Sequence, residues 1–354
     1  MDKADRRASR RNRSARRQAV KRVNLALQGG GAHGAFAWGV LDRLLEEDGI
    51  AFEGISATSA GAVNAVVCAH GLAKGGREGA RHSLREFWQQ ISRIACLSPI
   101  QPSFFDRLTG NHRLEASPAF LAFHMLTQVA SPYELNPLNY NPLHDVIEQS
   151  VDFELLRRSP QVKLFLSATN VRSGKIRVFE NPEMSADVVL ASACLPFLFQ
   201  AVEIDGEHYW DGGYMGNPAL FPLIYRCEQP DIVVVHINPI SRPDVPRTAA
   251  DILNRINEIS FNSSLMREVR AVEFLNRLVA EGRAPSPDIR QVRLHAIEAD
   301  DVMQHLGAAS KLNADWAFLT DLHAIGRRRA EAWLLDDFPK VGLQSSIDIQ
   351  GRYL

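Results

Sequence analysis

A serine between a predicted strand and a predicted helix has the clearest chemistry in this sequence. Residues 55–61 read Ile-Ser-Ala-Thr-Ser-Ala-Gly, with Ser59 at the junction and the small residues Ala57 and Gly61 two positions to either side. This spacing predicts a nucleophile elbow, because strand and helix approach closely around such a serine. The amide of Ala60 could help to stabilise an oxyanion. The alternative is an ordinary serine that caps a helix.

A glycine-rich loop precedes this serine in the chain. It stands between a predicted strand over 23–27 and a predicted helix over 34–47. Glycine leaves backbone N–H groups open to a ligand, and the start of a helix favours an anion. We therefore expect an oxyanion hole from Gly29, Gly30, Gly31, Ala32, His33 and Gly34. The same pattern fits a dinucleotide-binding turn with Glu53 as the ribose-binding acid, so a nucleotide-binding regulatory module is an alternative.

An acidic turn later in the chain offers a base for the serine. Asp211 is followed by Gly212 and Gly213, and then by Asn217 and Pro218. A free carboxylate with a pKa near about 3.9 is a poor base for a hydroxyl. It needs burial to raise its proton affinity and an oxyanion hole to hold the charge that forms. An ordinary turn is the alternative.

The apolar periodicity around these loops predicts an α/β fold. Strand, turn and helix alternate twice between residues 23 and 72, as in a parallel sheet with right-handed crossovers. We expect strands over 23–27, 52–58, 162–169, 175–179, 201–204, 208–210 and 232–237, and helices over 34–47, 60–72, 247–281 and 312–334. One domain over 23–340 and a C-terminal tail over 341–354 are expected.

Together the three loops resemble the bacterial patatin-like phospholipases. The glycine loop 29–34, the serine motif 57–61 and the turn 211–213 match in order and context, and the resemblance covers roughly residues 23–240. It implies a three-layer α/β fold with a central, mostly parallel sheet flanked by helices. It also implies a Ser59–Asp211 dyad without histidine that hydrolyses lipid acyl esters. No cofactor and no metal are expected.

Two positions depart from the family pattern. His33 stands where the family usually carries Arg or Lys, so the loop lacks that fixed positive charge. Ala57 replaces a glycine, and its extra methyl group is small enough to be tolerated. A Ser-His-Asp triad with His208 or His236 is the rival to the dyad. Neither histidine lies in the late position that α/β-hydrolases use, so we favour the dyad.

Charge and cysteine content bear on partners and location. Residues 1–22 carry ten Lys and Arg against two Asp, which predicts a disordered basic tail able to touch an anionic membrane transiently. The remainder is mildly acidic, so no nucleic-acid partner is expected. Scattered cysteines and the lack of a predicted span or secretory signal favour a cytoplasmic protein, with peripheral membrane contact as an option. No motif indicates an oligomeric state.

The substrate is expected to be a lipid or another acyl ester. Elbow and oxyanion loop would serve a storage polyester or a thioester equally well, so an intracellular hydroxyalkanoate depolymerase or a thioesterase stays open. The stretch 97–141 is rich in proline and aromatic residues. It is expected to form either a lid over the site or a helical excursion that completes the core.

Overall fold

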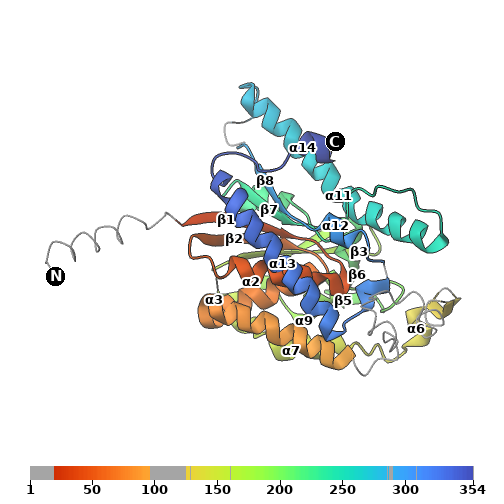
Figure 1. Ribbon diagram of the computed structural model, residues 1–354. Helices are drawn as coiled ribbons and strands as arrows, with labels where there is room; N and C mark the ends of the chain where they lie inside the picture. Colours follow the sequence, from red (N-terminus) through yellow and green to blue (C-terminus); the bar gives the residue numbers. More distant parts are fainter. Residues whose placement is uncertain are drawn as a thin grey trace.

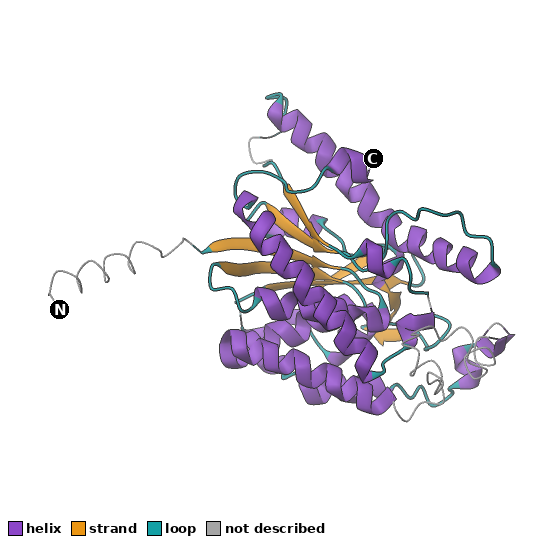
Figure 2. Cartoon of the chain, viewed as in Figure 1, coloured by secondary structure: helices purple, strands orange, loops and turns teal. Residues whose placement is uncertain are grey.

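A mixed sheet of eight strands lies at the centre of the described chain (Figures 1 and 2). The computed structural model describes residues 20–95, 125–127, 129–159, 161–284, 286, 290–307 and 309–353. The strands are β1 (Lys21–Leu27), β2 (Ile50–Ala57), β3 (Lys163–Asn170), β4 (Ile176–Glu180), β5 (Val202–Ile204), β6 (Glu207–Asp211), β7 (Asp231–Val235) and β8 (Arg293–Ile297).

The sheet is mostly parallel. Its order is β5-β6-β3-β2-β1-β7-β8, with β4 paired to β3. The ladders from β3 through β2, β1 and β7 to β8 are all parallel. The pairs that involve β4, β5 and β6 are antiparallel. The predicted α/β fold with a mostly parallel central sheet is therefore confirmed.

Helices cover both faces of the sheet, which gives three layers (Figure 1). One face packs on α2 (Gly34–Leu44), α3 (Ala60–Ala95), α7 (Pro142–Ser150), α8 (Phe153–Arg158), α9 (Ala186–Ser192) and α13 (Trp316–Asp336). The other face packs on α10 (Phe221–Arg226), α11 (Ala249–Ala280) and α14 (Ile349–Tyr353). Alternate residues of β1 serve the two layers, since Leu25 and Leu27 face the first core and Ala26 the second.

Shorter helices complete the chain. They are α6 (Pro132–Leu135), α12 (Asp300–Met303) and the 3₁₀ turns η1 (Gly31–His33), η2 (Asn181–Glu183), η3 (Gly212–Tyr214), η4 (Ala309–Leu312) and η5 (Phe338–Lys340). Three of these turns, η1, η3 and η4, lie in or beside the three loops that the sequence singles out.

The serine loop and the acidic loop meet along one side of strand β3. Its residues 165–169 pair with β4 along one side, so β2 and β6 share the other side. Ala57 at the end of β2 pairs with Leu166, and Asp211 at the end of β6 pairs with Ala168. Because β2 and β6 run toward each other along this edge, the segments that follow them start about 7 Å apart.

Strand β8 and helix α3 are two of the elements that differ from the sequence-based expectation. Strand β8 was not expected, because its five residues include a charged and a polar side chain. In the sheet its His295 is buried and bonded to Asp231 at 3.0 Å. The helix expected over 60–72 continues to Ala95 as α3, with a break in the helical backbone at Gly75 and Gly76.

The C-terminal segment packs onto the sheet and is not a separate tail. Helix α14 places Ile349 and Tyr353 in the same core as α11 residues Leu265 and Val269. The expected tail over 341–354 is corrected by this burial. Its apolar residues are too sparse for periodicity to reveal, because two side chains suffice to anchor so short a helix.

Parts of two predicted segments lie outside the described residues. These are residues 1–19 of the basic tail, and 97–124 and 128 of the stretch expected to be a lid or an excursion. The described remainder of that stretch contains α6. Within the described chain, no helix combines the length and the apolar character needed to cross a bilayer.

The role of the C-terminal segment can be tested by a single truncation of a side chain. Tyr353 is 1% exposed, so Tyr353→Ala should lower the free energy of unfolding by about 3 kcal/mol through lost burial and the cavity left behind. Denaturant unfolding measures this change. Leu343→Ala, at a side chain that is 79% exposed in the same segment, should stay within about 0.5 kcal/mol. Equal, small effects of both would show that the segment adds nothing to stability.

Candidate active site

Ser59 lies in a strained turn between β2 and α3. Its φ of 56° falls in the left-handed region, which is unusual for a residue with a side chain. A Cβ on Gly61 would come within 2.4 Å of the Leu27 carbonyl oxygen, so this position has to be glycine. Ala57, two residues before Ser59, is fully buried. The local geometry is that of a nucleophile elbow.

Ser192 holds the backbone of the elbow. The Ser59 amide donates to the carbonyl oxygen and to Oγ of Ser192, each at 3.1 Å. The Ser192 hydroxyl in turn donates to the Ser167 carbonyl oxygen on β3 at 2.7 Å. This chain of bonds fixes the turn to the central sheet. Ser192 lies 133 residues beyond Ser59, so local spacing could not predict this contact.

Asp211 is fully buried and has only one fixed hydrogen-bond donor in the described structure. The Gly213 amide donates to its Oδ1 at 2.7 Å, whereas Oδ2 has no hydrogen-bond partner among the described residues. Burial raises the pKa of Asp211 to about 6, although the Gly213 amide, the Ser59 hydroxyl and the charge of Lys311 act in the opposite direction. The carboxyl group therefore has an increased proton affinity and one free oxygen.

The structure brings the serine and the carboxyl group together. The Ser59 hydroxyl is close enough to Asp211 to lower its pKa by hydrogen bonding. Both residues lie at the carboxyl end of the sheet, where β2 and β6 meet along β3. Gly212 and Gly213 follow the acid in a close-packed turn, since a Cβ on Gly212 would lie 2.1 Å from the Ser167 oxygen.

The glycine-rich loop passes directly against the serine. A Cβ on Gly29 would lie 2.5 Å from the Ser59 Cβ. Gly31 adopts a φ of 58°, and a Cβ there would lie 2.4 Å from the Lys311 carbonyl oxygen. A Cβ on Gly34 would lie 2.7 Å from that of Ala60. Larger residues at these positions would displace the loop from the serine.

Only part of this loop has amides free to bind an oxyanion, which corrects the expectation that all six residues take part. The Gly29 amide already donates to Oδ1 of Asn217 at 2.7 Å. The amides of His33 and Gly34 bond within the η1 turn. Gly30, Gly31 and Ala32 remain at the start of this turn, where N–H groups have no acceptor in their own helix.

Gln28 and Asn238 hold the loop in place from behind. Gln28 Nε2 donates to the Asn217 carbonyl oxygen at 3.2 Å and to Asn262 Oδ1 at 2.9 Å. Its Oε1 accepts the amides of Ile237 and Asn238, both at 2.9 Å. Asn238 Nδ2 donates to the Gly29 carbonyl oxygen at 2.9 Å. These partners are distant in sequence, so no local pattern could reveal them.

His33 is buried and neutral. Its Nε2 lies 2.7 Å from the Ser310 hydroxyl, and burial together with the charge of Lys311 lowers its pKa to about 3. The imidazole of His33 therefore packs against the glycine loop and supplies no positive charge to it at neutral pH.

The histidines considered as rival bases serve other contacts. His208 lies 3.8 Å from Glu203, and His236 is buried against the Tyr353 hydroxyl with its pKa lowered to about 3 by burial and by Arg352. In the described part of the chain, none of the groups that shift the pKa of Asp211 is a histidine. This arrangement favours the dyad over a triad.

Glu53 does not serve a nucleotide. Its carboxylate accepts the amides of Glu228 and Gln229 at 2.8 Å and pairs with Lys163 at 3.0 Å. Both carboxylate oxygens of Glu53, which lies within β2, therefore bind the backbone of the turn at Glu228 and Gln229. Among the described residues, no cluster of three or more His, Cys, Asp or Glu side chains is arranged to hold a metal ion.

Comparison with known proteins assigns the fold and the loops to one family. The sequence profile of a family described as patatin-like phospholipase matches residues 25–224, which is more than half of the chain. The chain belongs to the patatin-like phospholipase family. The matched region includes Ser59 and Asp211, and membership points to hydrolysis of lipid acyl esters as the class of reaction.

Solved structures of two bacterial proteins are also similar. VipD from Legionella pneumophila shares 15% identity with a TM-score of 0.35, over 87% of this chain and 67% of VipD. ExoU from Pseudomonas aeruginosa, in complex with SpcU, shares 13% identity with a TM-score of 0.32, over 89% of this chain and 54% of ExoU. The patatin-like chain thus spans about half the length of ExoU. No curated protein matches it in sequence.

Because the glycine loop lies so close to the serine, we predict that one added methyl group at Gly29 strongly lowers activity. Gly29→Ala would place a Cβ 2.5 Å from that of Ser59, so the nucleophile or the loop must move. We expect esterase kcat/KM to fall at least about a hundredfold, as misplacement by about 1 Å does in other enzymes. Gly75→Ala is the matched control, because no atom lies within 4 Å of its added Cβ. Activity of Gly29→Ala close to that of the control would contradict the geometry.

The uncompensated burial of Asp211 predicts a pH-dependent change in stability. Its folded-state pKa is raised to about 6, so its stabilising contribution is present below the unfolded pKa near 4 and lost as pH rises through 6. Asp211→Asn lacks this loss and should unfold with a free energy about 2–3 kcal/mol higher than wild type at pH 8. Denaturant unfolding at pH 8 and pH 4 measures the difference, which should shrink at pH 4. A less stable variant at pH 8 would show that the ionised carboxyl is well compensated.

Proposed function

We propose that this chain is a lipid acyl hydrolase in which Ser59 and Asp211 form the catalytic dyad. The observation that carries the proposal is a buried carboxyl group of raised pKa beside the hydroxyl of a strained elbow serine. Its unpartnered Oδ2 is suited to accept a proton. The three free amides of the glycine loop begin within one residue of Gly29, which lies against the serine.

The proposed reaction has two balanced steps. Ser59 Oγ attacks the ester carbonyl carbon while Asp211 takes the hydroxyl proton, and the amides of Gly30, Gly31 and Ala32 stabilise the tetrahedral oxyanion. The C–O bond to the alcohol then breaks, and Asp211 returns its proton to the leaving oxygen. Water attacks the acyl-enzyme in the same way, with Asp211 as base, and releases the carboxylic acid and free Ser59.

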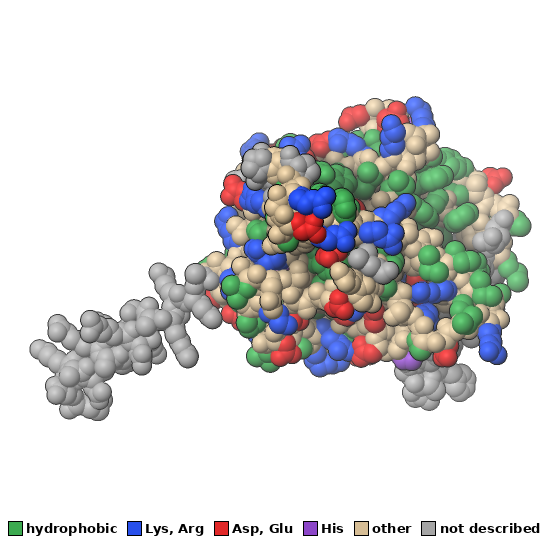
Figure 3. All heavy atoms as spheres, turned by 90° about the horizontal axis from the view of Figure 1, so that it is seen from above, with side chains coloured by type: hydrophobic (Ala, Val, Ile, Leu, Met, Phe, Trp, Pro, Cys, Tyr) green, Lys and Arg blue, Asp and Glu red, His purple; other side chains and the backbone are tan. Residues whose placement is uncertain are grey.

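Exposed apolar side chains support a lipid as the substrate. The first half of α11 exposes Ile252, Leu253, Ile256 and Ile259, which lie within about 14 Å along the helix of Phe261. Phe261 packs against Gly213 in the acid turn. Hydrophobic side chains gather toward the right in Figure 3, the side on which the strands of the parallel ladder end in Figure 1. Such a surface suits acyl chains better than small polar esters.

The basic segment at the N-terminus supports contact with anionic lipid. Lys21 and Arg22 begin β1, but the eight Lys and Arg residues among residues 1–19 would each contribute about 1 kcal/mol when close to an anionic surface. We propose a transient, peripheral contact of this kind. Comparing activity on anionic and neutral vesicles tests it, since only the former should bind the segment.

The dyad predicts a specific pattern of lost activity. Ser59→Ala should lower kcat/KM on a p-nitrophenyl ester at least about a thousandfold, and Asp211→Asn nearly as much. The double variant should be little worse than either single variant, because the two groups act as a unit. A fluorophosphonate should label wild type and leave Ser59→Ala unlabelled.

Controls separate this function from its alternatives. Ser241→Ala, at an exposed serine, should leave activity and labelling unchanged. Activity that survives Ser59→Ala would remove the proposed mechanism, and failure of wild type to react with the fluorophosphonate would favour a binding module. A panel of phospholipids, thioesters and hydroxyalkanoate oligomers then identifies the acyl group, with faster turnover of phospholipid expected.

A further inference from the structure

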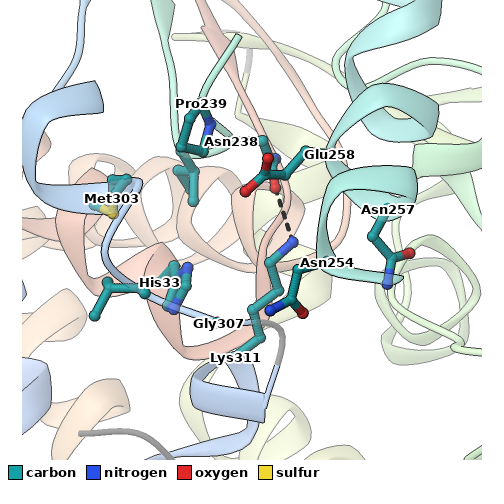
Figure 4. Close-up of a pocket in the computed structure, with 11 residues that line it drawn as sticks. His33, Asn238, Pro239, Asn254, Asn257, Glu258, Met303, Gly307 and Lys311 are labelled. Carbon is teal, nitrogen blue, oxygen red and sulfur yellow. Dashed lines mark hydrogen bonds between the residues drawn. The ribbon is translucent and has the colours of Figure 1, made fainter. Parts of the chain in front are cut away.

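Lys311 lies against the back of the glycine-rich loop. Its carbonyl oxygen fills the space beside Gly31, where a Cβ would come within 2.4 Å. Its Nζ donates to Asn238 Oδ1 at 2.8 Å, and Asn238 Nδ2 donates to the Gly29 carbonyl oxygen at 2.9 Å. Figure 4 shows the lysine directed toward Asn238 in a pocket that His33 and Glu258 also line. The ammonium group is thus two hydrogen bonds from the loop backbone.

The same ammonium group faces the acid turn. Its Nζ lies 5.5 Å from the centre of the Phe261 ring, and this ring packs directly on Gly213. Lys311 and Asp211 each shift the other's pKa through their charges. They form no direct ion pair within the described residues. Lys311 therefore acts on Asp211 through space, and both groups lie close to the Phe261 ring.

Glu258 and His33 are the other titratable groups that line the pocket around Lys311. The Glu258 carboxylate bonds to Arg242 and Arg255, and its charge also raises the pKa of Lys311. His33 is uncharged at neutral pH. The groups that face Lys311 from the elements around it are His33 on η1, Asp211 before η3, Arg242 after β7, and Arg255 and Glu258 on α11.

We propose that Lys311 is the positioning residue that supplies positive charge to this active site. Its ammonium group orients the glycine loop through Asn238 and favours the ionised form of Asp211 in the resting enzyme. Its positive charge lies behind the loop whose free amides are proposed to hold the oxyanion. The inference rests on the proposed function, but Lys311 lies outside the region 25–224 that the family profile matches.

This role sets an alkaline limit to activity. Burial lowers the pKa of Lys311 to about 8, against the charges of Glu258 and Asp211, which raise it. The active form needs Asp211 ionised and Lys311 protonated, so it exists between about pH 6 and pH 8. The neighbouring Cys194 and Tyr214 have pKa values raised to about 12 by burial, so they titrate well above this range.

The test is the pH profile of kcat/KM on a water-soluble p-nitrophenyl ester. Wild type should give a bell-shaped curve with limbs near pH 6 and pH 8. Lys311→Arg keeps a charge that persists to pH 12 and should lose the alkaline limb, with activity at pH 7 within about threefold of wild type. Lys311→Met should lower kcat/KM at pH 7 about tenfold and move the acid limb to higher pH.

Lys175→Met is the matched control, because Lys175 is exposed at the turn before β4. It should reproduce the wild-type curve. An alkaline limb near pH 8 that persists in Lys311→Arg, or a Lys311→Met profile like that of wild type, would overturn the inference. If Lys311→Met does not fold, Lys311→Arg decides, and a wild-type curve without a limb between pH 7 and 9 also overturns it. Activity that survives Ser59→Ala would instead overturn the proposed function.

Discussion

The site depends on the burial of one carboxyl group that has no direct ion-pair partner among the described residues. Asp211 has no exposed surface, receives one amide hydrogen bond on Oδ1, and leaves Oδ2 unpartnered among the described residues. Two other aspartates of this chain show the contrast. Bonds to His323, Arg81 and Arg327 hold the pKa of Asp42 well below its usual range, even though its burial acts the other way. Asp231 is similarly paired with His295 and Arg293. A carboxyl that is fully buried without such partners gains proton affinity, and a base that works without histidine needs this gain.

Strand β3 determines where Ser59 and Asp211 lie relative to each other. Leu166, Ser167 and Ala168 are consecutive on this strand, and each positions one part of the site. Leu166 pairs with the end of β2 before the serine, and Ala168 pairs with Asp211. Ser167 accepts the Ser192 hydroxyl that steadies the elbow, and its oxygen excludes any side chain at position 212. Ser59 and Asp211 are therefore both placed by one strand, which limits how far either can move.

The sequence predicted those parts of the site that depend on local spacing. A serine flanked by Ala57 and Gly61, and an acid before two glycines, describe sharp turns whose backbone geometry is set by neighbouring residues. The sheet and its mostly parallel order followed from strand and helix periodicity. What spacing could not predict was which amides of the glycine loop stay free. That depends on Asn217, 188 positions beyond Gly29, which takes one of them.

The burial of polar side chains also could not be predicted from the sequence. Gln28 looks like an interruption between a strand and a glycine loop, yet its side chain joins three distant segments through bonds on both its oxygen and its nitrogen. The C-terminal helix and β8 were missed for a related reason. Their residues become interior only when strand β7 and helix α11 provide the surfaces on which they pack.

The proposed roles of Lys311 and Asp211 require the two groups to influence each other without forming a direct ion pair. A direct ion pair would lower the pKa of the carboxyl group, as the paired aspartates show, and would remove the base. Complete removal of the positive charge would raise it further and leave the carboxyl protonated at neutral pH. An ammonium group behind the glycine loop, bonded to Asn238 and lying over the Phe261 ring, gives a charge effect between these limits. The same position joins this charge, through Asn238, to the backbone of the loop whose free amides are proposed to hold the oxyanion, so one lysine can act on both parts of the proposed site.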